Sequence, residues 1–226
     1  MPPAPFAVVE LFTSEGCSSC PPADKLLSDL AVEAESAGKP VFVLSFHVDY
    51  WNYLGWTDPF SRPEFTRRQQ RYAQILDGRV YTPQMIVNGS EAFIGSQEAT
   101  ARRSIGIALE QSAGAAITLM PVRDAGGGLT VEYAVTGTQE GDLLNLAVVD
   151  QGISMPVKRG ENKGRILKHE NVVRVFRTVR LDAEGKGSVG LEATPPVPSV
   201  HAMIIAYAQK SGTLRTLGAT RILSVF

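Results

Sequence analysis

The sequence predicts an α/β fold in its first half and an antiparallel β-sandwich in its second half. Residues 6–13 and 41–48 are short, β-prone and apolar on both faces, which is typical of strands in the middle of a sheet. Apolar residues at helical spacing fill 21–37 between them, so the three segments form a βαβ unit with parallel strands. Beyond residue 115, alternating apolar and polar segments separated by turn residues indicate short antiparallel strands.

The remaining elements follow from local signals. The first half continues with an aromatic loop at 49–60, a helix at 63–76, a hairpin at 81–95 that turns at Asn88-Gly89, and a helix at 97–111. The strands expected in the second half cover 117–120, 129–135, 143–149, 172–181, 188–191, 201–208 and 214–223, with turns that include 126–128 and 194–196. A boundary near 113–114 divides the chain into domains at 5–113 and 114–226.

Composition excludes several classes of protein. The chain has 226 residues, 44% of them hydrophobic, which is enough for a substantial core. A net charge of −1 gives no field that would attract nucleic acid or anionic membranes. No apolar run approaches the roughly 20 residues that cross a bilayer. The start at 1–5 lacks the features of a signal peptide, although a proline-rich start before a strand also suits a precursor whose signal peptide was replaced by Met1.

The chain has two cysteines, Cys17 and Cys20, at C-x-x-C spacing. A structural zinc site usually needs four ligands, and a disulfide-stapled scaffold needs more bridges in a shorter chain. The pair opens the first predicted helix, where unpaired backbone N–H groups and the helix dipole stabilise a thiolate. We expect Cys17, the more exposed of the two, to attack a substrate sulfur and Cys20 to resolve the mixed disulfide.

These features together resemble the thioredoxin fold family. The resemblance implies that Pro83 is a cis proline beside the cysteines and that Thr82 pairs with an extended substrate. Ser18-Ser19 departs from the dipeptides of familiar members, so the direction of catalysis stays open. Thioredoxins also carry a buried acid beneath the resolving cysteine. Glu10 is the nearest candidate for this proton transfer, but it is one residue out of step and would face the other side of the sheet.

A closer resemblance is to a bacterial secreted family known as domain of unknown function 1223. The segments that carry it are Val9–Asp24, His47–Trp51, Gly55–Trp56, Tyr81–Gln84, Arg159–Arg165 and His169–Arg174. Signal peptides are usual in this family, which implies a periplasmic or secreted setting where a disulfide can persist; a cytoplasmic setting is the alternative. The resemblance also favours a site-facing or interdomain role for the 159–165 loop through Glu161 and Arg165, against the default of a solvated loop.

Other polar and aromatic residues allow competing interpretations. His47 is a candidate proton partner for the thiol, a satisfied strand residue, or, with Asp49 and both cysteines, a ligand of zinc or copper. Tyr50, Trp51 and Trp56 form either a substrate groove or a small aromatic core under a long loop. His169 and His201 receive no role.

The sequence as a whole predicts a thiol-disulfide oxidoreductase that acts on protein or peptide thiols. It needs no cofactor and no resident metal, and an unidentified redox partner recycles it. The alternatives are a copper- or zinc-binding module that uses the same cysteines, and a non-enzymatic protein in which the disulfide is structural.

Overall fold

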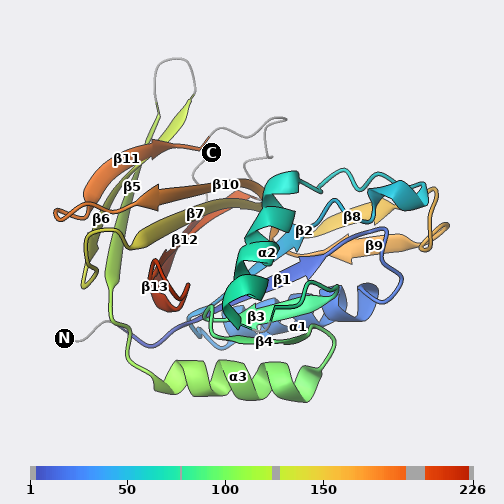
Figure 1. Ribbon diagram of the computed structural model, residues 1–226, viewed down its shortest axis with the longest axis horizontal. Coiled ribbons are helices and arrows are strands. Elements are labelled where there is room, and N and C mark those ends of the chain that lie inside the picture. The colour runs from blue at the N-terminus through green and yellow to red at the C-terminus, as the bar shows by residue number, and fades with distance from the viewer. Residues whose placement is uncertain (1–3, 77, 124–127, 192–201, 224–226) are drawn as a thin grey trace.

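The computed structural model describes residues 4–76, 78–123, 128–191 and 202–223. Its helices are α1 (Pro21–Ser36), α2 (Pro63–Leu76) and α3 (Glu98–Glu110), with a short 3-10 turn, η1 (Asn52–Leu54). Its strands are β1 (Ala7–Thr13), β2 (Val41–His47), β3 (Gln84–Val87), β4 (Glu91–Ile94), β5 (Ala116–Arg123), β6 (Leu129–Thr136), β7 (Leu143–Asp150), β8 (Ile153–Pro156), β9 (Ile166–His169), β10 (Val172–Arg180), β11 (Lys186–Gly190), β12 (Ala202–Gln209) and β13 (Thr216–Leu223). The described residues therefore form a mixed α/β fold (Figure 1).

Most predicted elements are confirmed within a few residues. β1 and β2 pair in parallel through α1, and β3 and β4 form the expected hairpin. The prediction missed β8 and β9, two strands of four residues each, because 159–165 between them carries a loop composition. His201 and the turn at 194–196 lie outside the described residues, as does most of the turn at 126–128. No helix in the described ranges is long and apolar enough to cross a membrane.

The second half does not form a sandwich with two sheets of its own. Four of its strands extend the first half into one eight-stranded, mostly antiparallel sheet with the order β13-β12-β7-β10-β2-β1-β3-β4. The junction is β10, which lies parallel to β2 with Val172 opposite Ser45. The Ser45 N–H donates to the Asn171 carbonyl at 3.0 Å, and the Asn171 amide donates to the Val43 carbonyl at 2.9 Å. The boundary near 113–114 stays a prediction, since the sheet runs across it.

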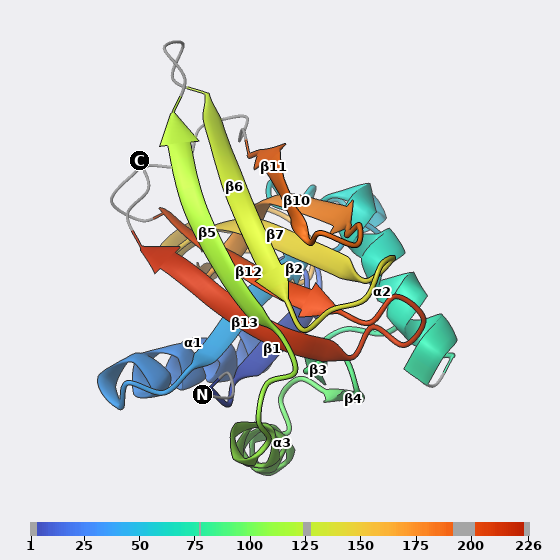
Figure 2. The same cartoon turned by 90° about the vertical axis from the view of Figure 1, so that its left-hand side faces the viewer.

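A second, smaller sheet packs against the second-half strands of the large sheet. A three-stranded sheet, β11-β6-β5, covers the β13-β12-β7-β10 part of the large sheet (Figure 2). α1 and α3 cover the same face over the first-half strands, and α2 lies on the opposite face. β1, β2, β7 and β12 are buried along their whole length because both faces are covered, which explains their continuous apolar runs.

A buried ion pair joins the two halves on the α2 face. The Arg68 guanidinium donates to both carboxylate oxygens of Glu10, at 2.6 and 2.8 Å. It also donates to the Tyr207 hydroxyl at 2.8 Å and to the Gln209 side chain at 3.2 Å, both on β12. Glu10 is 1% exposed, so its charge depends on these partners rather than on water.

We expect Glu10→Gln to lower the free energy of unfolding by about 3–5 kcal/mol, because it leaves the buried Arg68 charge without its anion. Denaturant unfolding measures this change. The matched control is Glu33→Gln, which breaks a solvent-exposed pair with Arg102 and leaves the denaturation midpoint nearly unchanged. Equal midpoints for the two variants would contradict the structural role of Glu10.

Candidate functional site

The two cysteines lie in the loop between β1 and α1. They form a disulfide with Cα atoms 5.4 Å apart, and Cys20 directly precedes the helix. Pro21 and Pro22 begin the helix, and proline has no N–H. This helix start therefore offers fewer backbone donors to a thiolate than its position in the sequence led us to expect.

Both cysteine side chains are buried, at 0% exposure, whereas Ser18 and Ser19 between them are exposed. The expectation that Cys17 is the more exposed cysteine is therefore wrong. The reason is tertiary, since segments distant in the sequence surround the loop. Trp51 is one of them, because a Cβ added at Gly16 would lie 3.0 Å from its Cβ.

Trp51 and Thr82 form a hydrogen-bonded chain that ends on Cys17 Sγ, and Ser19 makes a separate contact with the same sulfur. The Thr82 hydroxyl donates to this sulfur at 3.3 Å, and the Thr82–Pro83 peptide bond is cis. The Ser19 hydroxyl lies 3.3 Å from the same sulfur and is the donor, because a disulfide sulfur has no proton. The Trp51 Nε1–H donates to Thr82 Oγ1 at 2.8 Å, which leaves the hydroxyl proton of Thr82 for the sulfur.

A groove of about 740 Å³ lies beside this chain. Its lining includes Ser19, Val80, Tyr81, Thr82, Pro83 and Ile94. Val80 and Ile94 are 43% and 48% exposed, so the groove presents apolar surface to solvent next to the disulfide loop.

The predicted aromatic residues do not line this groove. Their polar atoms instead form hydrogen bonds with other side chains. The Tyr50 hydroxyl donates to Gln69 at 3.1 Å, and burial raises the pKa of Tyr50 to about 12. The Trp56 Nε1–H donates to Glu15 at 2.8 Å.

The tip of the β8–β9 hairpin, residues 157–165, holds the disulfide loop; we call it the clamp. The buried Asn162 amide donates to the carbonyls of Glu15 and Cys17, both at 2.9 Å. The Ser18 N–H donates to the Glu161 carboxylate at 3.0 Å. Arg165 donates to the Asn162 side-chain oxygen at 3.1 Å and so orients the amide.

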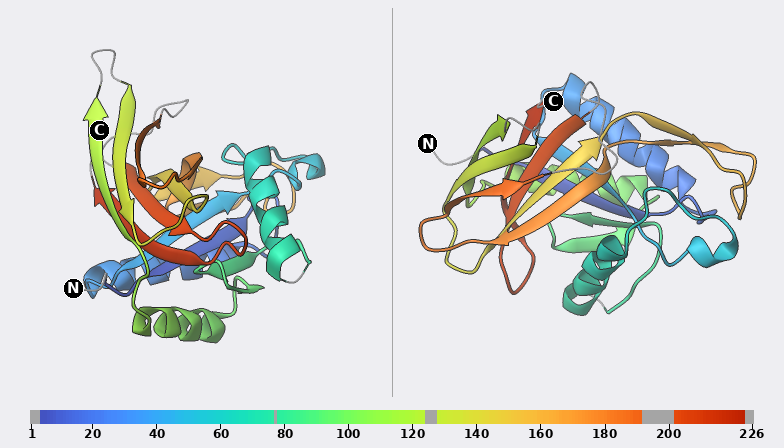
Figure 3. Two further views of the ribbon diagram at one scale, coloured as in Figure 1. Left: turned by 60° about the vertical axis from the view of Figure 1, so that its left-hand side comes forward. Right: turned by 90° about the horizontal axis from the view of Figure 1, so that it is seen from above.

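A glycine allows the clamp to approach the loop that follows β2. Gly160 has φ +74°, and a Cβ there would lie 3.1 Å from the Trp56 Cβ. Seen from above, the hairpin extends from the large sheet past α1 to the loop that follows β2 (Figure 3, right).

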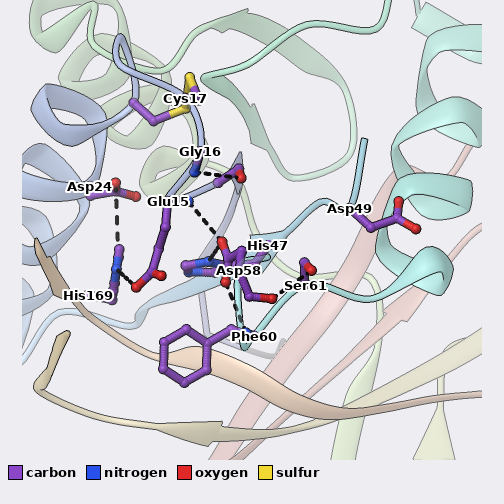
Figure 4. Close-up of polar contacts among 12 residues, drawn as sticks. Glu15, Gly16, Cys17, Asp24, His47, Asp49, Asp58, Phe60, Ser61 and His169 are labelled. Atoms are coloured by element: carbon purple, nitrogen blue, oxygen red, sulfur yellow. Dashed lines mark hydrogen bonds and ion pairs between the residues drawn. A yellow bond between two sulfur atoms is a disulfide. The ribbon is translucent and has the colours of Figure 1, made fainter. Parts of the chain in front are cut away.

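A buried cluster of acids and imidazoles lies beneath the disulfide (Figure 4). His47 Nδ1 contacts the Asp58 carboxylate at 2.7 Å, and His169 Nε2 contacts the Glu15 carboxylate at 3.2 Å. The two imidazole rings lie edge to face with centroids 4.7 Å apart. Asp24 on α1 faces His169, with Oδ2 4.0 Å from Nδ1.

The charges in this cluster shift the pKa values of its members. Burial alone lowers the pKa of His47, but the carboxylates of Asp58, Asp24 and Glu15 raise it above its ordinary value. Burial alone raises the pKa of Asp58, but His47 and two backbone N–H groups lower it below its ordinary value. His47 and Asp58 therefore favour the charged, paired state.

Glu10 and His47 were the candidates for proton transfer, and the structure separates them. His47 belongs to the cluster, and its Nε2 has no hydrogen-bond partner among the described residues. Glu10 lies on the α2 face of the sheet and is held by Arg68, opposite the face that α1 covers.

The four residues considered for a metal site are not brought together. Asp49 accepts a hydrogen bond from Thr66 on α2 and points away from Cys17 (Figure 4). Among the residues that the structure describes, no group of three or more His, Cys, Asp or Glu side chains is arranged to hold a metal ion.

Residues 8–209 match the family model described as protein of unknown function (DUF1223). The chain belongs to the DUF1223 family. The predicted resemblance is therefore confirmed at the level of the family.

One solved structure is similar to this DUF1223 chain over nearly its whole length. It is the X-ray crystal structure of protein AGR_C_4864 from Agrobacterium tumefaciens, a structural genomics target. The two chains are 31% identical with a TM-score of 0.70, and the match covers 98% of this chain and 95% of the other. The comparison with curated proteins finds no match.

Sequence reasoning missed Glu15, Asp24, Asp58, Asn162 and His169 as site residues. Two of them carried a local signal, because Glu15 lies two residues before Cys17 and Asp24 lies one helical turn after Cys20. The others come from segments that only the folded chain brings to the disulfide.

We expect Asn162→Ala to lower the free energy of unfolding of this DUF1223 chain by about 1–3 kcal/mol, because it removes the amide donor from the buried Glu15 carbonyl and leaves the Cys17 carbonyl with the Cys20 N–H as its donor. Denaturant unfolding of the oxidised protein measures this loss. Lys163→Ala, an exposed change in the same clamp, is the control and leaves stability unchanged. A clamp without energetic importance would give the two variants the same midpoint.

Proposed function

We propose that this chain is a thiol-disulfide oxidoreductase that exchanges disulfides with protein or peptide thiols through Cys17 and Cys20. The observation that carries the proposal is the convergence of the Thr82 and Ser19 hydroxyls on Cys17 Sγ. Thiolate is the attacking species in disulfide exchange, and donors to the charged form stabilise it. Since Pro21 and Pro22 offer no N–H, these hydroxyls take the place of backbone donors at the helix start.

The proposed reaction balances as a two-electron exchange. The Cys17 thiolate attacks one sulfur of a substrate disulfide, and the other substrate sulfur leaves as a thiolate that takes a proton from solvent. Cys20 then attacks Cys17 Sγ, which re-forms the protein disulfide and releases the second substrate sulfur. The substrate gains the two electrons that the protein loses, and a dithiol partner protein returns the pair to the reduced state. The reverse sequence oxidises a substrate dithiol.

We also propose that residues 5–113 form a thioredoxin-like unit that the second half extends. Three observations support this. β1 and β2 are parallel and connected by α1, the C-x-x-C pair begins that helix, and cis Pro83 precedes an antiparallel β3. Residues 114–226 then add strands to the free edge of β2 and supply the clamp.

The groove beside Thr82 and Pro83 supports a peptide as substrate. It is open, apolar and borders the residue whose hydroxyl reaches Cys17. A chain segment in extended conformation fits such a surface, because it buries alternate side chains and leaves its backbone polar groups free to pair. A periplasmic or secreted location is part of the proposal, since a disulfide persists there.

A structural disulfide is the second candidate. The observation that favours it is the complete burial of both cysteines under segments held by the clamp. The two candidates differ in the reactivity of the reduced pair, which the next two experiments measure.

We expect Cys20→Ser to trap a mixed disulfide between Cys17 and a substrate peptide, because the resolving thiol is absent. Mass spectrometry of the oxidised mixture measures the adduct. Cys17→Ser is the matched control and accumulates far less adduct, since the remaining thiol lacks the donors around Cys17 Sγ. A structural disulfide predicts no adduct with either variant under native conditions.

We expect Thr82→Val to slow alkylation of reduced Cys17 by iodoacetamide about tenfold at neutral pH, because a hydrogen bond to a charged group contributes roughly 1.5–3 kcal/mol. Thr66→Val makes the same change at the hydroxyl that contacts Asp49 and leaves the rate unaltered. Equal rates in the wild type and both variants would argue against an activated Cys17.

A further inference from the structure

The buried cluster beneath the disulfide contains one carboxyl group more than its imidazoles can pair. Glu15 pairs with His169, and Asp58 pairs with His47, both within hydrogen-bond distance. Asp24 is the third carboxyl and is 4% exposed. Its Oδ1 has no hydrogen-bond partner in the described part of the chain, and its Oδ2 lies 4.0 Å from His169. Because a buried carboxylate without a close cation is costly, Asp24 is the member of the cluster best suited to take up a proton.

Asp24 lies in the first turn of α1, one helical turn after the N-cap residue Cys20. The two residues are four apart, and the Asp24 N–H donates to the Cys20 carbonyl at 3.1 Å. Side chains one helical turn apart have Cβ atoms about 5–6 Å from each other. Both side chains are buried, so both point into the protein, while Ser18 and Ser19 point to solvent.

A second groove gives Asp24 a route to solvent. This groove, of about 450 Å³, lies between α1 and β9, and Asp24 contributes to its wall together with Pro21, Lys25, Ser28, Leu167 and Lys168. A proton placed on Asp24 can leave through this groove without passing the disulfide.

The groups around Asp24 determine its protonation. On the cluster side these groups are His169 on β9, His47 on β2, Thr13 at the end of β1, and Glu15 and Asp58 in the adjoining loops. On the groove side they are Lys25, Asp29 and Lys168. Burial raises the pKa of Asp24, and His169, His47 and Thr13 offset only part of this rise. Its pKa is therefore above the ordinary value, as suits a group that alternates between carboxylate and carboxylic acid.

We propose that Asp24 accepts the proton of Cys20 when Cys20 attacks the mixed disulfide, directly or through one bridging water. In this step the Cys20 S–H proton moves to the Asp24 carboxylate, and the sulfur electron pair forms the bond to Cys17 Sγ. The bond from Cys17 to the substrate sulfur breaks, and its electron pair leaves on that sulfur. The inference rests on the proposed function and adds a specific proton acceptor to it.

The test is a single turnover of the reduced full-length protein with the aromatic disulfide 5,5′-dithiobis(2-nitrobenzoate). The first release of thionitrobenzoate reports the attack by Cys17, and the second reports the attack by Cys20. We expect Asp24→Asn to leave the first rate within about twofold and to slow the second by about tenfold or more, since general-base catalysis contributes at least that much. The control is Glu35→Gln, which also neutralises a carboxylate of α1 but at an exposed position that does not line the groove between α1 and β9, and it leaves both rates unaltered.

The pH dependence of the second release provides a readout that a structural role would not move. In the wild type the rate follows the loss of the proton from Asp24 rather than the ionisation of a thiol, whose ordinary pKa is about 8.5. In Asp24→Asn the rate rises only through the thiol range, because hydroxide must then remove the proton.

Each outcome has a distinct meaning. If the wild type shows no first release, the proposed function fails. If both releases occur and Asp24→Asn changes neither the second rate nor its pH profile, the role of Asp24 fails and the proposed function stands. If Asp24→Asn does not fold, as judged by circular dichroism, the wild-type profile decides alone, and a rise confined to the thiol range overturns the role of Asp24.

Discussion

The parallel placement of β10 beside β2 is the constraint on which the rest of the structure depends. The contact itself is small: Val172 lies opposite Ser45, and Asn171 exchanges two hydrogen bonds with the β2 backbone. It nevertheless joins the strands of both halves into one sheet. It also fixes the place of the β8–β9 hairpin, because β9 ends at His169, just before this junction. His169 therefore meets His47, at the end of β2, with ring centroids 4.7 Å apart.

Buried charge makes the two halves depend on each other. On the α2 face, Arg68 forms an ion pair with Glu10. Arg68 also donates hydrogen bonds to Tyr207 and Gln209 of the second half. On the α1 face, Glu15 is satisfied by His169 of the second half. A fragment that ended near residue 113 would lose these partners while keeping the buried charges, which is costly in an apolar interior. The same physical requirement therefore favours one cooperative structure.

The candidate site is assembled from segments that are far apart in the sequence. The Thr82 hydroxyl accepts a hydrogen bond from the Trp51 indole and donates one to Cys17 Sγ. The Asn162 amide donates to the Cys17 carbonyl. Each contact is a single hydrogen bond, and such bonds contribute only about 0.5–1.5 kcal/mol net. Their geometric effect is larger than their energy, because together they hold one sulfur at the border of an open apolar groove.

The sequence by itself determined the local structure and the family. Periodicity, proline positions and the Asn88-Gly89 turn depend on neighbouring residues, so the βαβ unit, the β3–β4 hairpin and the C-x-x-C at a helix start were predictable. Only the tertiary structure decided that the sheet runs through both halves, that Cys17 is buried, and that Asp24, Asn162 and His169 belong to one site. The physical reason is that these properties arise from contacts between segments that are far apart in the sequence, several of them by more than a hundred residues. Local patterns specify which face of an element is apolar, but they do not specify which distant segment covers that face.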